Sequence, residues 1–169
     1  MIVSHDYWHV QIDFKPFHEK PPLFIWMQAM SMNWFGINEY AARFPNAVCG
    51  FITLLSLYSI GKKHVSRGFA LAWVITYIGS LLPHFYFKSG IIDPWFNYFI
   101  FISLYFIYRF FKSQSFNYLL ISGLFSGLAV FTKGPVAFLL LGITIFIFLT
   151  IAYVKKNKPF PWFFWFKSG

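Results

Sequence analysis

The fold is decided by an uncharged apolar run, PVAFLLLGITIFIFLTIAYV, at residues 135–154. A helix needs about 20 apolar residues to cross the hydrocarbon core of a bilayer, so this run is long enough to span one upright. The whole chain of 169 residues is 58% hydrophobic and only 11% charged. Soluble domains carry roughly 25% charged residues, so this composition excludes an ordinary water-soluble globule and predicts an integral membrane protein.

Four further apolar segments precede that run, at 46–61, 68–87, 94–111 and 118–132. With it, they predict an all-α polytopic bundle of about five spans over residues 44–154. The segment 118–132 also contains Gly123 and Gly127, a small-xxx-small spacing that predicts close approach of another helix. Beside these glycines, Ser122 and Ser126 are placed to hydrogen-bond across that contact.

The remaining segments flank the bundle. Residues 1–43 are mixed in polarity, and within them Leu23–Phe35 is apolar but too short to span. We interpret Leu23–Phe35 as an interfacial helix in an outer loop, with tryptophans at headgroup depth. Residues 155–169 are predicted to form a basic and aromatic cytoplasmic tail that is truncated. Its aromatic part is either an interfacial segment or the start of another span.

The basic residues give an orientation. Eight lie in loops that the five spans place on one side, whereas only Lys88 and Lys133 lie in the opposite short loops. The positive-inside rule puts the first group in the cytoplasm: Lys62, Lys63, Arg67, Arg109, Lys112, Lys155, Lys156 and Lys158. Residues 1–43, the 88–93 loop and the 133–135 turn are then expected to share the outer, extracytoplasmic face of an inner-membrane protein. The net charge of +9 therefore indicates membrane orientation rather than nucleic-acid binding.

Three positions on that face could carry chemistry, and the first is Glu19-Lys20-Pro21-Pro22. The prolines stiffen the segment, and a lysine held there just above the interface is suited to a lipid phosphate. Glu19 could orient Lys20, contact a sugar hydroxyl or bind a divalent metal ion, to which the neighbouring His18 would add a weak ligand. The simpler interpretation is an exposed ion pair of little energetic value, and residue types alone favour it.

Asp93 is the second position and Lys133 the third. Asp93-Pro94 is typical of a helix start, where the aspartate caps the helix; the functional alternative is a carboxylate that accepts a proton from a substrate hydroxyl. Lys133 precedes Gly134-Pro135 at the start of the last span, which suits a phosphate site. The alternative is a lysine that snorkels from a tight turn, and the spacing alone favours this alternative.

Taken together, several motifs resemble a known family, the dolichyl-phosphate-mannose–protein mannosyltransferases and their bacterial relatives, including the lipid A aminoarabinose transferases. The resembling pieces are His5-Asp-Tyr-Trp8, Phe17-His-Glu-Lys-Pro-Pro-Leu-Phe-Ile-Trp26, Phe35-Gly-Ile-Asn-Glu39, Ala42-Arg-Phe-Pro45, Asp93, and Gly127-Leu-Ala-Val-Phe-Thr-Lys-Gly-Pro135. Their order extends over nearly the whole chain.

The resemblance implies a GT-C fold and an inverting glycosyltransferase that moves a sugar from a polyprenyl-phosphate donor. The acceptor would be a protein hydroxyl, lipid A or another envelope glycan. It also implies that Lys20 and Lys133 bind the lipid phosphate and that Asp93 and Glu19 are catalytic, Glu19 supporting the lysine or a bound metal.

One departure from the family pattern shapes the expectation. The family's principal acidic residue follows an initial transmembrane helix and lies upstream of the point that matches Met1, so the chain is expected to be an N-terminal fragment or to have a misassigned start, and to be inactive alone. The alternatives are a non-enzymatic membrane protein or the remnant of a broken gene. A transporter would place ionisable residues near mid-bilayer, whereas here they cluster at the outer ends of the spans.

Overall fold

The computed structural model describes the backbone of residues 11–12, 15–16 and 21–156, and side chains from residue 21 to residue 151. Two antiparallel two-residue strands, β1 (Gln11–Ile12) and β2 (Lys15–Pro16), precede the helices. The helices are α1 (Leu23–Phe35), α2 (Glu39–His64), α3 (Arg67–Gly79), α4 (Leu81–Lys88), α5 (Asp93–Ser113), α6 (Phe116–Lys133) and α7 (Val136–Lys156). The predicted all-α helical bundle is confirmed.

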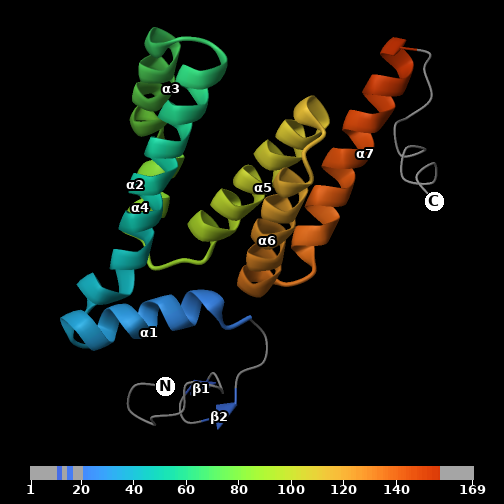
Figure 1. Ribbon diagram of the computed structural model, residues 1–169. Helices are drawn as coiled ribbons and strands as arrows, with labels where there is room; N and C mark the ends of the chain where they lie inside the picture. Colours follow the sequence, from blue (N-terminus) through green and yellow to red (C-terminus); the bar gives the residue numbers. More distant parts are fainter. Residues whose placement is uncertain (1–10, 13–14, 17–20, 157–169) are drawn as a thin grey trace.

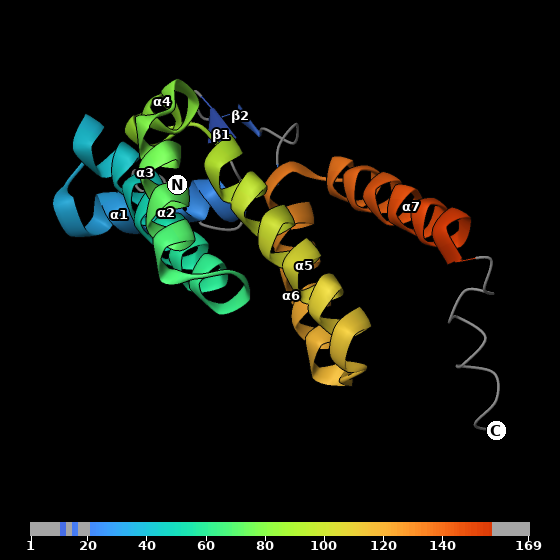
Figure 2. The same ribbon diagram turned by 90° about the horizontal axis from the view of Figure 1, so that it is seen from above.

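The helices form an up-and-down array with α1 lying across one end of it (Figure 1). Helix α2 leads away from α1, and α3 and α4 return alongside α2. Helices α5 and α6 make the most extensive pair, and α7 packs beside them as an outer layer (Figure 2). The predicted interfacial segment Leu23–Phe35 is a helix with these bounds, set crosswise to the others as an interfacial helix would be.

Helix α2 begins seven residues before the apolar run at 46–61. Its first turn is capped by Asn38, whose side-chain oxygen accepts a hydrogen bond from the Ala41 N–H at 2.8 Å. Pro45 lies inside the helix, where it removes one backbone donor without ending it. The hydropathy pattern marks only the apolar part of this helix, because its first turns carry polar residues.

Residues 68–87, expected as one apolar span, do not form one continuous helix. The segment is divided into α3 and α4, whose axes differ by 68° across a break at Ser80. Pro83 explains the break, because its ring would collide with the carbonyl of Gly79 in a continuous helix. In the observed arrangement Pro83 falls in the first turn of a new helix, where its missing N–H has no helical partner to lose.

The α5–α6 pair is joined by a buried serine cluster. Ser103 Oγ lies 3.0 Å from Ser122 Oγ and 2.8 Å from Ser126 Oγ, which confirms the predicted role of the two α6 serines. The accompanying prediction for Gly123 and Gly127 is wrong within this structure, since a Cβ built on either glycine meets no described atom within 4 Å. The serines and glycines lie on different faces of α6, and α5 packs on the serine face.

Two described helices, α2 and α6, are each long and apolar enough to cross a membrane, and the bent pair α3–α4 would make a third span. The apolar part of α7 covers Val136–Ile151 within the part described in full. Large apolar side chains are exposed along several helices, as lipid-facing surfaces require, among them Phe51, Ile75, Leu124, Phe138 and Phe146. These features agree with a membrane protein, while the expected total of five spans and the division at residues 44 and 154 stay predictions.

Candidate functional site

Asp93 and Lys133 form an ion pair at the end of the bundle that faces α1. Lys133 Nζ donates to Asp93 Oδ1 at 2.6 Å, although the two residues are 40 positions apart. Asp93 is the first residue of α5 and Lys133 the last of α6, so the antiparallel pairing of these helices brings them together. The side chains are only 32% and 40% exposed.

The interpretation of Asp93 as a helix cap is wrong. Ile92 holds the N-cap position of α5, Asp93 is the first residue inside the helix, and its side chain pairs with Lys133. Lys133 reaches Asp93 and also lies over the Phe96 ring, with Nζ 5.3 Å from the ring centroid. A cation held against a carboxylate and an aromatic face is positioned rather than freely mobile.

The pair rests on a buried apolar cluster: Phe96, Phe99, Ala129 and Ala137. Leu23 and Met27 of α1 pack against the same cluster. The first turn of α1, directly after the Lys20-Pro21-Pro22 segment, is therefore fixed against the site by hydrophobic contact.

The turn between α6 and α7 brings the proline motif closer still. Gly134 has φ +78 and ψ −153, a region that only glycine enters readily, and its N–H bonds to the Val130 carbonyl at 2.7 Å. A Cβ built on Gly134 would lie 3.8 Å from Pro21 Cγ. Pro21, the neighbour of Lys20 in sequence, therefore lies in contact range of the turn that carries Lys133.

Two amide side chains hold the loop before Asp93. Asn46 Nδ2 lies 2.7 Å from the carbonyl oxygens of both Ser89 and Ile91, and Gln28 Nε2 donates to the Gly90 carbonyl at 3.3 Å. Amide side chains that donate to a loop backbone restrict the conformations of that loop. The position of Asp93 is thus determined from α1 and α2 as well as from its own helix.

Sequence reasoning did not identify Asn46 or Gln28 as supporting residues. Gln28 lies within the apolar segment Leu23–Phe35, and Asn46 is the first residue of the segment 46–61. A polar side chain in or beside an apolar segment needs a hydrogen-bond partner. Trp95 is a third supporting residue, since its indole Nε1 donates to the Pro45 carbonyl at 3.1 Å. That bond joins the start of α5 to the proline inside α2.

The other predicted site residues, His18, Glu19 and Lys20, lie outside the described residues. Within the described part of the chain, no group of three or more His, Cys, Asp or Glu side chains could hold a metal ion. Asp93 is engaged by Lys133, which makes it a poor metal ligand. The described residues thus do not fit a metal, and a metal site would depend on Glu19 and His18.

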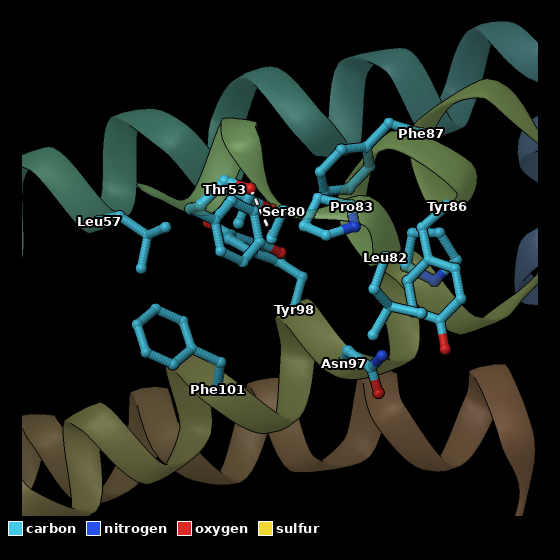
Figure 3. Close-up of a pocket in the computed structure, with 12 residues that line it drawn as sticks. Thr53, Leu57, Ser80, Leu82, Pro83, Tyr86, Phe87, Asn97, Tyr98 and Phe101 are labelled. Atoms are coloured by element: carbon cyan, nitrogen blue, oxygen red, sulfur yellow. Dashed lines mark hydrogen bonds between the residues drawn. The ribbon is translucent and has the colours of Figure 1, made fainter. Parts of the chain in front are cut away.

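A cavity of about 320 Å³ opens beside this end of the bundle, between α2, α4 and α5 (Figure 3). Its walls are mainly apolar, with Leu57, Pro83 and Phe101 among them, and Tyr98 and Asn97 add polar groups. Pro94, the residue after Asp93 in sequence, also lines it, whereas Asp93 and Lys133 are not among its described lining residues. An apolar space with a few polar groups suits a largely apolar ligand.

Comparison with known proteins agrees with the sequence resemblance. Residues 19–166 match the family described as dolichyl-phosphate-mannose-protein mannosyltransferase. An uncharacterized protein of Aquifex aeolicus strain VF5 is 35% identical over 122 residues, which are 72% of this chain and 28% of that protein. The undecaprenyl phosphate-alpha-4-amino-4-deoxy-L-arabinose arabinosyl transferase of Photorhabdus laumondii is 27% identical over 147 residues, 83% of this chain and 26% of the relative.

A solved structure has the same fold. The crystal structure of ArnT from Cupriavidus metallidurans in the apo state aligns with a TM-score of 0.82 at 17% identity, over 89% of this chain and 29% of that one. The chain thus spans between a quarter and a third of the length of these relatives. The family match covers most of the chain, and the helical arrangement agrees with it. The chain therefore belongs to the dolichyl-phosphate-mannose-protein mannosyltransferase family.

Proposed function

We propose that this chain contributes to a glycosyltransferase that moves a sugar from a polyprenyl-phosphate donor to an acceptor at the extracytoplasmic face of the inner membrane. The observation that carries the proposal is the Asp93–Lys133 pair at 2.6 Å, with Pro21 of the Lys20 motif against the adjoining turn. It unites at one end of the bundle three segments that the sequence singles out separately. The donor class is that of the named arabinosyl transferase relatives.

The site would have to perform one displacement. An acceptor oxygen attacks the anomeric carbon while the bond from that carbon to the phosphate oxygen breaks, so the configuration inverts. The leaving polyprenyl phosphate gains negative charge, which Lys20 and Lys133 would stabilise as point charges. Preorganised charges of this kind act most strongly in a site that excludes water.

Asp93 would take the proton that a hydroxyl acceptor loses. Lys133 orients this carboxylate through the 2.6 Å contact, and binding of the donor phosphate would draw the lysine toward the new anion. Glu19 would orient Lys20 or contact a sugar hydroxyl. A phosphate acceptor already carries its negative charge and would not need Asp93 as a base.

The apolar cavity beside Asp93 supports a lipid-linked donor. It begins at Pro94 and extends between α2, α4 and α5, so an isoprenoid chain could lie there with its phosphate near Lys133. A water-soluble nucleotide sugar would gain nothing from such walls. The exposed apolar helices next to this space are consistent with entry of the donor from the bilayer.

The test uses native membranes that contain the protein and a polyprenyl-phosphate sugar labelled in the sugar. We expect Lys20→Ala and Lys133→Ala each to reduce transfer by about 10²- to 10³-fold, the loss typical of one charge-stabilising group. Lys63→Ala, at the opposite end of the bundle, is the matched control and should leave transfer unchanged.

Undiminished transfer in both lysine variants would reject the proposed phosphate site. Absence of transfer with any lipid-linked sugar would instead favour a non-enzymatic membrane protein. The acceptor can be identified separately by mass spectrometry of lipid A and envelope glycans in a deletion strain. Asp93→Asn then separates acceptor classes, since about 10²- to 10⁴-fold is lost with a hydroxyl acceptor and little with a phosphate.

A further inference from the structure

A second hollow, lined by cationic side chains, lies at the same end of the bundle as the Asp93–Lys133 pair. It is formed between the first turns of α2 and the last turn of α4. Its volume is about 430 Å³, and the described residues that line it are Arg43, His84, Phe85, Lys88, Ser89 and Gly90. We propose that this hollow binds the headgroup phosphate of an anionic membrane phospholipid. The proposal does not depend on the glycosyltransferase function.

The donors in this hollow are arranged rather than scattered. Lys88 Nζ lies 2.9 Å from His84 Nε2, one helical turn earlier, so the histidine directs the ammonium group. Arg43 Nη2 donates to Glu39 Oε2 at 2.9 Å. A guanidinium group has five N–H donors, so this contact leaves others to face an anion.

The charge of the hollow is unbalanced, which distinguishes it from the Asp93–Lys133 site. Lys133 meets its carboxylate at 2.6 Å, whereas the described lining of the hollow contains no acidic side chain. Glu39 offsets part of the Arg43 charge but stands apart from the lining, with its side chain 85% exposed. Two cations facing a space whose described wall contains no acid attract an anion.

The surface next to these cations indicates that the anion is a lipid. Leu81, Leu82 and Phe85 of α4 are all exposed, and Phe85 itself lines the hollow. A soluble phosphate would leave this apolar face in water, whereas a phospholipid would cover it with acyl chains while its phosphate meets Lys88 and Arg43. The bend between α3 and α4 turns this short helix out of line with α3.

The experiment measures lipid binding to the purified full chain in detergent micelles by native mass spectrometry. Phosphatidylglycerol and phosphatidylcholine with identical acyl chains are compared for the wild type, for Lys88→Gln and for the double variant Arg43→Gln/Lys88→Gln. The control double variant, Lys62→Gln/Lys63→Gln, removes two cations at the opposite end. We expect a preference for phosphatidylglycerol that weakens about fivefold for each cation lost from the hollow and is unchanged in the control.

Three outcomes would overturn the proposal. The first is equal binding of phosphatidylglycerol and phosphatidylcholine by the wild type. The second is a loss of the preference for phosphatidylglycerol in the control double variant as large as that in the hollow variants. The third is displacement of phosphatidylglycerol by inorganic phosphate at similar affinity, which would indicate a soluble anion. Circular dichroism and thermal unfolding establish that the variants are folded. If the double variant unfolds, Lys88→Gln alone decides, because Lys88 is exposed at a helix end and its replacement should not disturb packing.

Discussion

The Asp93–Lys133 ion pair is the contact on which the proposed site depends, and its strength can be measured. Fully exposed pairs contribute about 0.2–1 kcal/mol, whereas hydrogen bonds to charged groups contribute about 1.5–3 kcal/mol. This pair is about one-third exposed, with 2.6 Å between Nζ and Oδ1, and so lies between the two classes. We expect a coupling free energy of about 1 kcal/mol, or about a fivefold change in the folding equilibrium.

The measurement is a double-mutant cycle on the free energy of unfolding in mixed micelles, with Asp93→Asn, Lys133→Gln and the double variant. Glu39 and Arg43 provide the matched control, because they pair at 2.9 Å on one helix face with side chains 85% and 54% exposed. Their coupling should not exceed about 0.5 kcal/mol. A coupling for Asp93–Lys133 that is near zero, or no larger than that of the control, would refute the claim that the structure holds these two residues together.

Two further pairs of substitutions, each a test with its control, examine how the site and the bundle are built. Gly134→Ala should lower the free energy of unfolding by about 1–3 kcal/mol, because φ +78 with ψ −153 strains any residue with a Cβ. Gly142→Ala inside α7 meets no described atom and should stabilise by up to about 1 kcal/mol, so equal effects at the two glycines would contradict the turn geometry. Ser103→Ala should cost about 1 kcal/mol by removing the bonds to α6, measured by the same unfolding assay. Ser59→Ala removes only a hydrogen bond within one helical turn and should be nearly neutral; a similar loss there would show that the α5–α6 bonds add nothing.

The sequence was sufficient to place α5, α6 and α7, because hydrocarbon selects for long apolar runs. Helices α5, α6 and α7 begin within two residues of the predicted segments 94–111, 118–132 and 135–154. The start of α2 was missed because Asn38 caps a helix whose first turns contain the charged residues Glu39 and Arg43. Hydropathy reports the environment of a segment, whereas caps and prolines determine where the backbone hydrogen bonds begin and end.

The break in the second predicted span shows the same limit. An average over 68–87 is apolar throughout and conceals Pro83, whose ring disfavours a continuous helix across Gly79. Pro45 inside the unbroken α2 shows that a proline alone does not decide between a continuous helix and a break. The break also shapes the apolar cavity, since Leu82, Pro83 and Phe87 of α4 line it.

The pairing of Asp93 with Lys133 could be anticipated only as a shared side of the membrane. Counting alternating spans places both residues on one face, but it gives no distance, because any two of the outer ends could be neighbours. The distance comes from the packing of α5 on α6, which the buried serines and the aromatic residues of both helices determine.

The polar residues inside apolar segments carried the missing information about the site. Gln28 and Asn46 each bond to the 89–91 backbone, and Trp95 bonds to Pro45, so three helices converge on the loop that ends at Asp93. A polar side chain is costly in such surroundings unless it has a partner, and the partners here are backbone groups with no signature in the sequence. The proposed role of Asp93 as a base requires a carboxylate that is held in place, and these hydrogen bonds to the loop backbone supply that rigidity. Interruptions of apolar runs near an outer loop are therefore the positions at which a reader of such sequences should expect the supports of a site.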